Sequence, residues 1–360
     1  MGDWRIREGE CHPVFVYEVG LAVDLQAVAR TIASEPNLRP IQTLAGYDSL
    51  PAMLRMSFAT EAFVIPPFRI DGTIEFVVYE FGAASVGYTI PLGDSPDDLL
   101  ALSLALRGHR DLEADARRRV EGLVAILGAA IQRPRVAEPV EDYWVVEVRA
   151  LEGIADIVAL QARHGDLIAR TLRAAPGPLS AEEVGDALES HLSVGRDDVA
   201  FVDWDSALIV DRNPGAIRAV LEFANVQLLE LRYLDGQLDQ ALERSYQRLS
   251  RPPGWRQLAP APFTADLRKI SELQLESAML LERVTNVLKF FAEERSARIY
   301  RLAAARLHLK DWDTSITRKL ETLNRIHENL SSRAASRRME FLEWLVILLI
   351  ATEILLGLAR

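Results

Sequence analysis

Short apolar runs alternate with longer amphipathic stretches along the first 250 residues of the chain. Strand-like runs, rich in β-branched and aromatic residues, cover residues 14–19, 53–65, 73–81, 85–90, 142–148, 199–202 and 207–210. Helical patterns cover residues 25–34, 94–131, 151–193 in two pieces, and 213–249. Strands and helices follow one another without regular alternation, so the pattern predicts an α+β fold with a small antiparallel sheet.

The C-terminal region has a different pattern. From Phe263 to Leu356 there is neither glycine nor proline, which is typical of long helices. Large apolar residues recur there every seven positions, at Leu302, Leu309, Ile316, Leu323 and Leu330. This spacing predicts the seam of a coiled coil, through which the protein would form homo-oligomers.

Residues 311–314, Asp-Trp-Asp-Thr, have the composition of a turn followed by a helix cap. We therefore expect a long antiparallel hairpin of two helices, over residues 263–309 and 314–358. A continuous helical rod is the alternative.

These patterns divide the chain into five predicted parts. They are an α+β domain over 1–150, a mostly helical continuation over 151–250 with a short hairpin at 199–211, a linker over 251–262, coiled-coil helices over 263–338, and an apolar helix over 339–360.

The apolar helix predicts a transmembrane anchor. Its candidate anchor residues are Phe341, Leu342, Glu343, Trp344, Leu345, Val346, Ile347, Leu348, Leu349, Ile350, Glu353, Ile354, Leu355 and Leu356. A helix of this length spans about 28 Å, close to the hydrocarbon thickness of a bilayer. Its apolar side chains favour insertion by about 5 kcal/mol, whereas each of the two carboxylates opposes it by up to about 3 kcal/mol.

The net free energy of insertion is therefore near zero. Insertion becomes more favourable if Glu353 is protonated or faces a partner helix. Glu353 is then either a functional residue or a residue that is only buried and paired. Arg333, Arg337 and Arg338 precede the apolar run and would contact lipid head groups. Their position predicts that the bulk of the chain lies on the cytoplasmic side of the inner (cytoplasmic) membrane. The alternative is an apolar tail buried in the protein's own helical bundle.

Charge and cysteine content add two constraints. The net charge is −11, yet residues 283–338 carry an excess of basic side chains. An acidic protein is a poor ligand for nucleic acid, so RNA or ribosome association through this basic segment is a weaker hypothesis. The single cysteine, Cys11, excludes an intrachain disulfide, and the N-terminal residues lack a secretory signal.

Two stretches resemble a known family. The run Leu342–Ile350 followed by Glu353 and Ile354, and the strand Phe76–Gly82, are similar to the terminal signature and the hairpin strand of the required-for-meiotic-nuclear-division (sporulation) family. That family includes a mitochondrial inner-membrane protein that supports mitochondrial translation. The resemblance implies a bacterial member that is membrane-anchored, self-associating and non-enzymatic, with a link to translation.

Residues with catalytic chemistry are scarce. No phosphate loop, dinucleotide fingerprint or zinc-binding histidine pair is present, and the six histidines occur singly. Cys11 and His12 would point to opposite faces of a strand, which disfavours a nucleophile–base pair. Asp203 and Asp205, with Asp211 beyond the turn, could hold a divalent cation, but they are better explained as turn and cap residues.

The sequence therefore predicts no enzyme, no cofactor and no metal. The leading hypothesis is a membrane-tethered, self-associating scaffold whose cytoplasmic domain binds a protein partner. The alternatives are a soluble coiled-coil adaptor with its tail buried in its own bundle, and a metal-dependent enzyme using the three aspartates.

Overall fold

The structure is a computed structural model that describes residues 4–41, 52–61, 63–193, 195–249, 271–273, 275, 278 and 294–358. The chain divides into two compact units. The first comprises Met1–Tyr233 and Glu282–Asp311, and the second comprises Leu234–Leu281 and Trp312–Arg360.

A mixed β-sheet forms the centre of the first unit, and ten of its strands are described. Its strand order is β12-β13-β14-β11-β1-β8-β7-β4-β3, and β9 pairs with β1. The strands are β1 (Arg5–Glu18), β3 (Leu38–Pro40), β4 (Met53–Ala59), β7 (Thr73–Tyr79), β8 (Ala83–Gly87), β9 (Ile90–Pro91), β11 (Val140–Glu152), β12 (His191–Leu192), β13 (Val199–Val202) and β14 (Ser206–Val210). Two small ribbons pair β2 (Ala22–Val23) with β10 (Ile131–Gln132) and β5 (Phe63–Ile65) with β6 (Phe68–Ile70).

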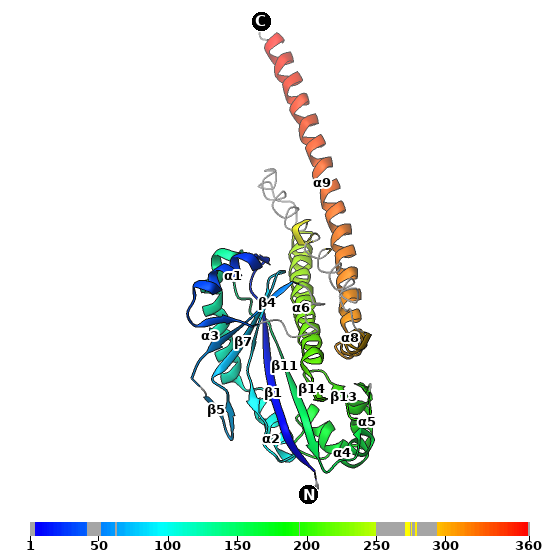
Figure 1. The fold of residues 1–360 in the computed structure, drawn as a ribbon. Helices are drawn as coiled ribbons and strands as arrows, with labels where there is room; N and C mark the ends of the chain where they lie inside the picture. The colour runs from blue at the N-terminus through cyan, green and yellow to red at the C-terminus, as the bar shows by residue number, and fades with distance from the viewer. Residues whose placement is uncertain are drawn as a thin grey trace. The chain divides into compact units, whose positions relative to one another are not determined.

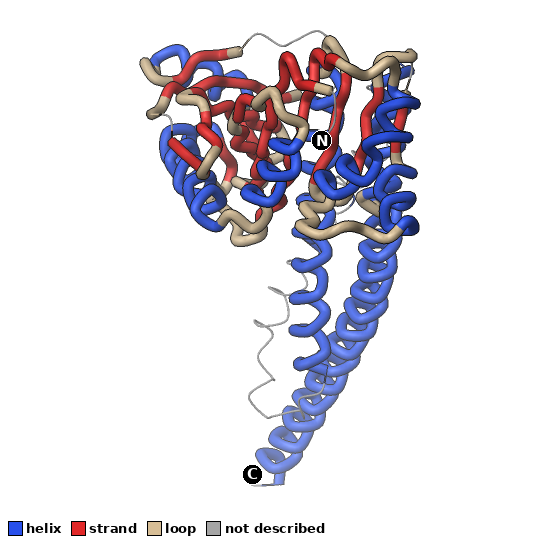
Figure 2. Tube along the Cα trace, turned by 90° about the horizontal axis from the view of Figure 1, so that it is seen from below, coloured by secondary structure: helices blue, strands red, loops and turns tan. Residues whose placement is uncertain are grey.

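Helices cover both faces of this sheet. The described helices of the whole chain are α1 (Leu25–Ser34), α2 (Asp97–Leu106), α3 (Arg110–Leu127), α4 (Ile157–Leu172), α5 (Ala181–Glu189), α6 (Gly215–Leu249), α8 (Glu294–Arg306) and α9 (Leu309–Leu358), with a short 3-10 helix over Gly128–Ala130. Helices α1 and α3 lie on one side of the sheet, and the first part of α6 lies on the other (Figure 1). A second view shows the strands in red with helices around them (Figure 2).

Strand β1 shows how sequence alternation assigns the two faces. Phe15 and Tyr17 belong to the hydrophobic core shared with α1–α4, and the Tyr17 hydroxyl donates to the backbone oxygen of Glu113 on α3. Successive side chains of a strand point to opposite faces, so the intervening Val14 and Val16 face the side of α6. Both valines are buried, and Val14 lines a small cavity together with Glu222 of α6, so this face of the sheet carries a second buried layer.

Local signals explain where several helices begin and end. The Asp24 carboxylate accepts from the backbone N–H groups of Gln26 and Ala27 and so caps α1, and Ser180 with Glu183 forms a capping box on α5. Gly108, with φ of +67°, separates α2 from α3. The helix predicted over 94–131 is therefore two helices.

The mixed α+β class agrees with the prediction, but the sheet is larger than expected. The predicted hairpin around residues 82–84 is present as β7 and β8. The hairpin of β13 and β14 joins the same sheet, because β14 pairs in parallel with β11. The sheet thus continues beyond residue 150.

The second unit contains a pair of parallel helical segments. Asp235 on α6 contacts Ser315 and Lys319 on α9, and the ammonium group of Lys319 also lies 2.6 Å from the Asp239 carboxylate. Leu238, Ile316 and Leu323 are fully buried beside these polar contacts. The apolar heptad face of α9 is therefore covered within the chain.

The described residues do not show the long antiparallel hairpin predicted over 263–309 and 314–358. Residues 311–314 lie inside α9, and the helix break falls earlier, at His308, whose φ is +51°. A left-handed residue ends a helix, and an aspartate such as Asp311 is favourable in the first turn of the next one. Most of the first predicted helix, and all of the predicted linker over 251–262, lie outside the described residues.

The predicted membrane anchor is also wrong. Within the part of the chain that the structure describes, no helix combines the length and the apolarity needed to cross a membrane. The predicted anchor, Phe341 to Leu356, is instead the distal part of the 50-residue helix α9. The physical reason is that Glu343 and Glu353 offset the gain from the apolar side chains. The inner-membrane location and the membrane as a partner rested on this anchor and are corrected with it.

Candidate functional site

Strands β1 and β11 bring three chemically active side chains together. Their antiparallel register places Glu10 directly opposite Glu147, and His12 opposite Val145. Residues two apart in a strand share a face, so Glu10 and His12 point to the same side. That side is the one covered by α6, whereas Cys11 belongs to the opposite core, in agreement with the expectation for this dipeptide.

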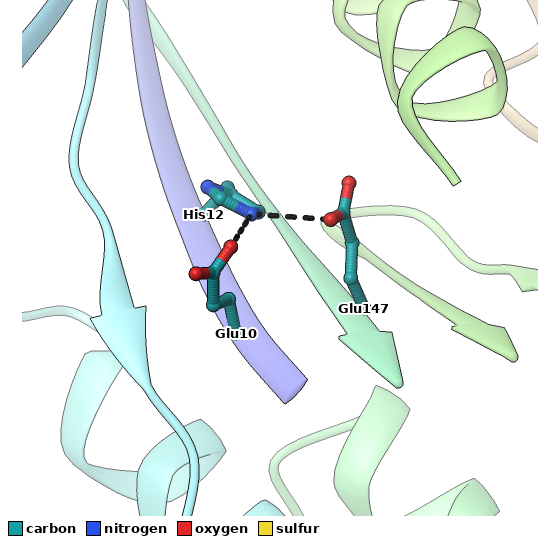
Figure 3. Close-up of side chains that lie close together, drawn as sticks. All are labelled: Glu10, His12 and Glu147. Atoms are coloured by element: carbon teal, nitrogen blue, oxygen red, sulfur yellow. Dashed lines mark ion pairs between the residues drawn. The ribbon is translucent and has the colours of Figure 1, made fainter. Parts of the chain in front are cut away.

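The His12 imidazole lies between the two carboxylates (Figure 3). Its Nε2 atom is 3.5 Å from Glu10 Oε2 and 3.4 Å from Glu147 Oε2, which are ion-pair distances but long for hydrogen bonds. Its Nδ1 atom lies 3.4 Å from the Thr89 hydroxyl. Burial and the Arg218 charge lower the pKa of His12, but the two carboxylates outweigh them, so its pKa is raised from the ordinary value.

Two arginines complete the surroundings of Glu147, which is almost wholly buried. Arg149 Nη2 lies 3.0 Å from Glu147 Oε2 and 2.8 Å from Glu10 Oε2. Arg218 Nε on α6 lies 3.1 Å from Glu147 Oε1. Burial by itself raises the pKa of Glu147. The opposing effects of His12 and the two arginines are larger in sum, so the pKa of Glu147 is lowered. The neighbouring His12 imidazole is the largest cause that lowers the pKa of Glu10, to about 2.

The charges continue along the same sheet face to a second buried group. Arg55 Nη2 on β4 lies 2.7 Å from Glu222 Oε2 on α6, and Arg55 also pairs with Glu75 on β7. Arg218 links the two groups, because its Nη1 atom lies 3.8 Å from Glu75 Oε2. Beside Arg55, Glu75 and Glu222 is a cavity of about 10 Å³, room for about one water molecule.

The formal charges of this network nearly cancel. Its members are the acids Glu10, Glu75, Glu147 and Glu222, the cations Arg55, Arg149 and Arg218, and His12. Four carboxylates and three guanidinium groups leave one negative charge, which a protonated His12 neutralises, and the exposed Glu8 adds one further carboxylate at the edge of the network, 3.6 Å from Arg149. Buried charges are costly unless paired, and this network pairs charges on the sheet with charges on α6.

Sequence reasoning missed this site. The Glu-x-His pattern at residues 10–12 is compatible with a shared strand face, but its partner Glu147 lies far along the chain. The described residues contain one group of this kind that could hold a metal ion, formed by Glu10, His12 and Glu147. Each residue offers one ligand atom, and the three atoms all lie within 4.8 Å of one another.

The three predicted aspartates do not form one site. Arg306 Nη2 lies 2.6 Å from Asp203 Oδ1, and Asp211 pairs with Arg295 while also accepting from the backbone N–H of Asn213. Arginine partners take the positions that a cation would need, and the contacts support the turn and cap explanation. Burial, followed by the Asp203 charge, raises the pKa of Asp205 to about 6.

The predicted seam residues are mostly buried within one chain. Leu309, Ile316 and Leu323 are buried and Leu302 is half-buried. The side chains of Leu330, Arg333, Arg337 and Arg338 lie outside the described part of the structure. The same holds for many of the predicted anchor side chains, namely Phe341, Leu342, Trp344, Leu345, Leu348, Glu353, Ile354, Leu355 and Leu356.

Five side chains of the predicted anchor are described, all of them exposed, and one of the five is the charged Glu343. Val346, Ile347, Leu349 and Ile350 are 52%, 54%, 58% and 51% exposed, and we call them the distal α9 surface.

Comparison with known proteins gives a different relationship from the one predicted. The family model described as "Uncharacterized protein MJ0711, N-terminal domain" matches residues 8–216, which include Glu10, His12 and Glu147. The uncharacterized protein MJ0711 of Methanocaldococcus jannaschii is 22% identical over 196 residues. These residues are 54% of this chain and 59% of that relative, so the match spans less than two thirds of the relative's length.

No solved structure matches the chain. The family match overturns the predicted resemblance to the meiotic-nuclear-division family, including the link to translation implied by it. The two short stretches that suggested it are an ordinary hairpin strand and an apolar helix end, which unrelated sequences share.

Proposed function

The chain belongs to the family of the uncharacterized protein MJ0711 N-terminal domain, and we propose that it is a non-catalytic adaptor that self-associates through the distal α9 surface. The observation that carries this proposal is the exposure of Val346, Ile347, Leu349 and Ile350, each of which is more than half exposed. Contiguous exposed apolar residues are typical of interaction sites.

The distribution of these residues around the helix favours helix–helix association. At about 100° per residue, the four side chains cover an arc of about 160°. A helix that packs into a core has an apolar stripe of at least about 100°. The distal α9 surface is therefore wide enough to be buried between helices.

A second copy of the chain is the occupant that we propose. Ile316 and Leu323 are already buried within one chain, so this part of the heptad seam is not open to another copy. The distal α9 surface has the exposed apolar groups that a self-complementary, two-fold interface requires. Self-association would cover this surface, and the sheet-based unit would remain available for an unidentified protein partner.

Sedimentation velocity of the purified full chain, up to about 100 µM, tests the proposal. We expect a dimer or larger species for the natural chain and monomer for the double variant Ile347→Lys with Ile350→Lys. Val158→Lys is the matched control, because Val158 is an apolar residue of α4 that is 73% exposed. A natural chain that is monomeric throughout, or a double variant that still assembles, would refute the proposal.

A further inference from the structure

The three ligand atoms of Glu10, His12 and Glu147 have the spacing of a metal site. His12 Nε2 lies 3.5 and 3.4 Å from the two Oε2 atoms, and all three atoms lie within 4.8 Å of one another (Figure 3). A tetrahedral zinc ion, with ligand bonds of about 2.0–2.1 Å, holds its ligand atoms about 3.4 Å apart. The observed separations therefore match those of ligands around a shared ion better than those of a direct hydrogen bond.

The His12 ring is buried, and its Nε2 atom forms no hydrogen bond. Buried polar atoms almost always have a partner. The Nδ1 atom can donate to the Thr89 hydroxyl, so a cation that displaces the Nε2 proton would meet a lone pair directed at the space between the two carboxylates. Metal-bound histidines commonly have this arrangement, with the second ring nitrogen held by a hydrogen bond.

Arg149 supplies positive charge at the same place. Its Nη2 atom is 2.8 Å from Glu10 Oε2 and 3.0 Å from Glu147 Oε2, the two oxygens nearest to His12. The Arg149 side chain is partly exposed at the rim of the group, and its Nη1 atom lies 3.6 Å from Glu8 Oε1. Arg149 thus has another carboxylate to pair with when it leaves the Oε2 atoms of Glu10 and Glu147.

We propose that Glu10, His12 and Glu147 bind one divalent transition-metal ion such as Zn²⁺, and that the Arg149 guanidinium takes the place of the ion in the metal-free protein. One imidazole and two carboxylates are donors that suit a first-row divalent ion. The ion neutralises the two carboxylates, and Arg218 remains on the far oxygen of Glu147. Metal and Arg149 therefore compete for the same two oxygens.

Zinc titration of the purified full chain against a chromophoric chelator tests this site. We expect one Zn²⁺ per chain, and binding that is weaker by about tenfold or more in His12→Gln and in Glu10→Gln. Arg149→Gln removes the competing cation and should bind Zn²⁺ at least about tenfold more tightly. A purely structural charge cluster predicts no such gain.

Arg7→Gln is the matched control, because Arg7 pairs with exposed Glu152 across the same two strands. Its zinc affinity should equal that of the natural chain. The proposal fails if neither the natural chain nor Arg149→Gln binds Zn²⁺ stoichiometrically, or if His12→Gln leaves the affinity unchanged.

Discussion

Glu147 on β11 and Arg218 on α6 form a buried ion pair, with 3.1 Å between Glu147 Oε1 and Arg218 Nε. The pair joins β11, an interior strand of the sheet, to helix α6. It also lies at the junction between the His12 group and the Arg55 group, so both depend on it.

Removal of the Glu147 carboxylate should destabilise the fold strongly. Glu147→Ala leaves Arg149 and Arg218 without their shared buried partner, and breaking a buried ion pair costs about 3–5 kcal/mol. We expect a loss of this size in the free energy of unfolding, measured by urea denaturation. Glu152→Ala, which removes an exposed partner of Arg7, is the control and should leave the midpoint unchanged. Equal urea midpoints for Glu147→Ala and Glu152→Ala would contradict the role of Glu147 as a buried ion-pair partner.

The stability of the fold should decrease with rising pH through the His12 transition. The folded-state pKa of His12 is raised above the ordinary value of about 6.5. Its contribution is therefore fully present below pH of about 6.5, and it is lost as the pH rises through the folded pKa. Denaturation of the natural chain and of His12→Gln between pH 5 and 9 measures the contribution. A difference between the two proteins that stays constant over this range would contradict a raised pKa.

The sequence predicts local elements well where short-range signals decide them. Helix α1 has the bounds that the apolar period and the cap residue Asp24 indicate. The hairpin of β7 and β8 follows from two strand-like runs around Gly82.

The sequence does not predict which strands pair when they are far apart along the chain. The parallel contact of β14 with β11 joins segments separated by two helices, and neither strand encodes its partner. The same limitation hid the candidate site, because Glu10 and His12 meet Glu147 only through the register of β1 on β11. The heptads of α9 predicted a seam between chains, whereas Ile316 and Leu323 are buried within one chain beside α6, and the pattern does not name the covering helix.

Gly82 should tolerate no side chain. Its φ is +106°, and an added Cβ atom would lie 2.0 Å from the backbone oxygen of Gly20. Gly82→Ala should therefore destabilise the chain by more than about 1 kcal/mol in urea denaturation. Gly122, on the exposed side of α3, has no atom within 4 Å of such a Cβ. Gly122→Ala should stabilise the chain by about 0.5–1 kcal/mol, so the two substitutions should change stability in opposite directions. Stabilisation by both would show that the turn is not constrained as described.

Asp205 should be a source of instability at neutral pH. Burial and the neighbouring charge of Asp203 raise its folded-state pKa to about 6, above the ordinary value of 3.8. The folded chain therefore holds this proton more tightly than the unfolded chain. The resulting stability is present below pH 3.8 and is lost as the pH rises through about 6. At neutral pH, Asp205→Asn removes the buried charge and should raise the free energy of unfolding by about 2–3 kcal/mol. Below pH 3.8 the same variant should gain nothing from this source, because both side chains are then neutral.

Asp197→Asn, at an exposed position before β13, is the control and should change stability little at either pH. A gain for Asp205→Asn that is the same at both pH values would assign the effect to packing and contradict the raised pKa.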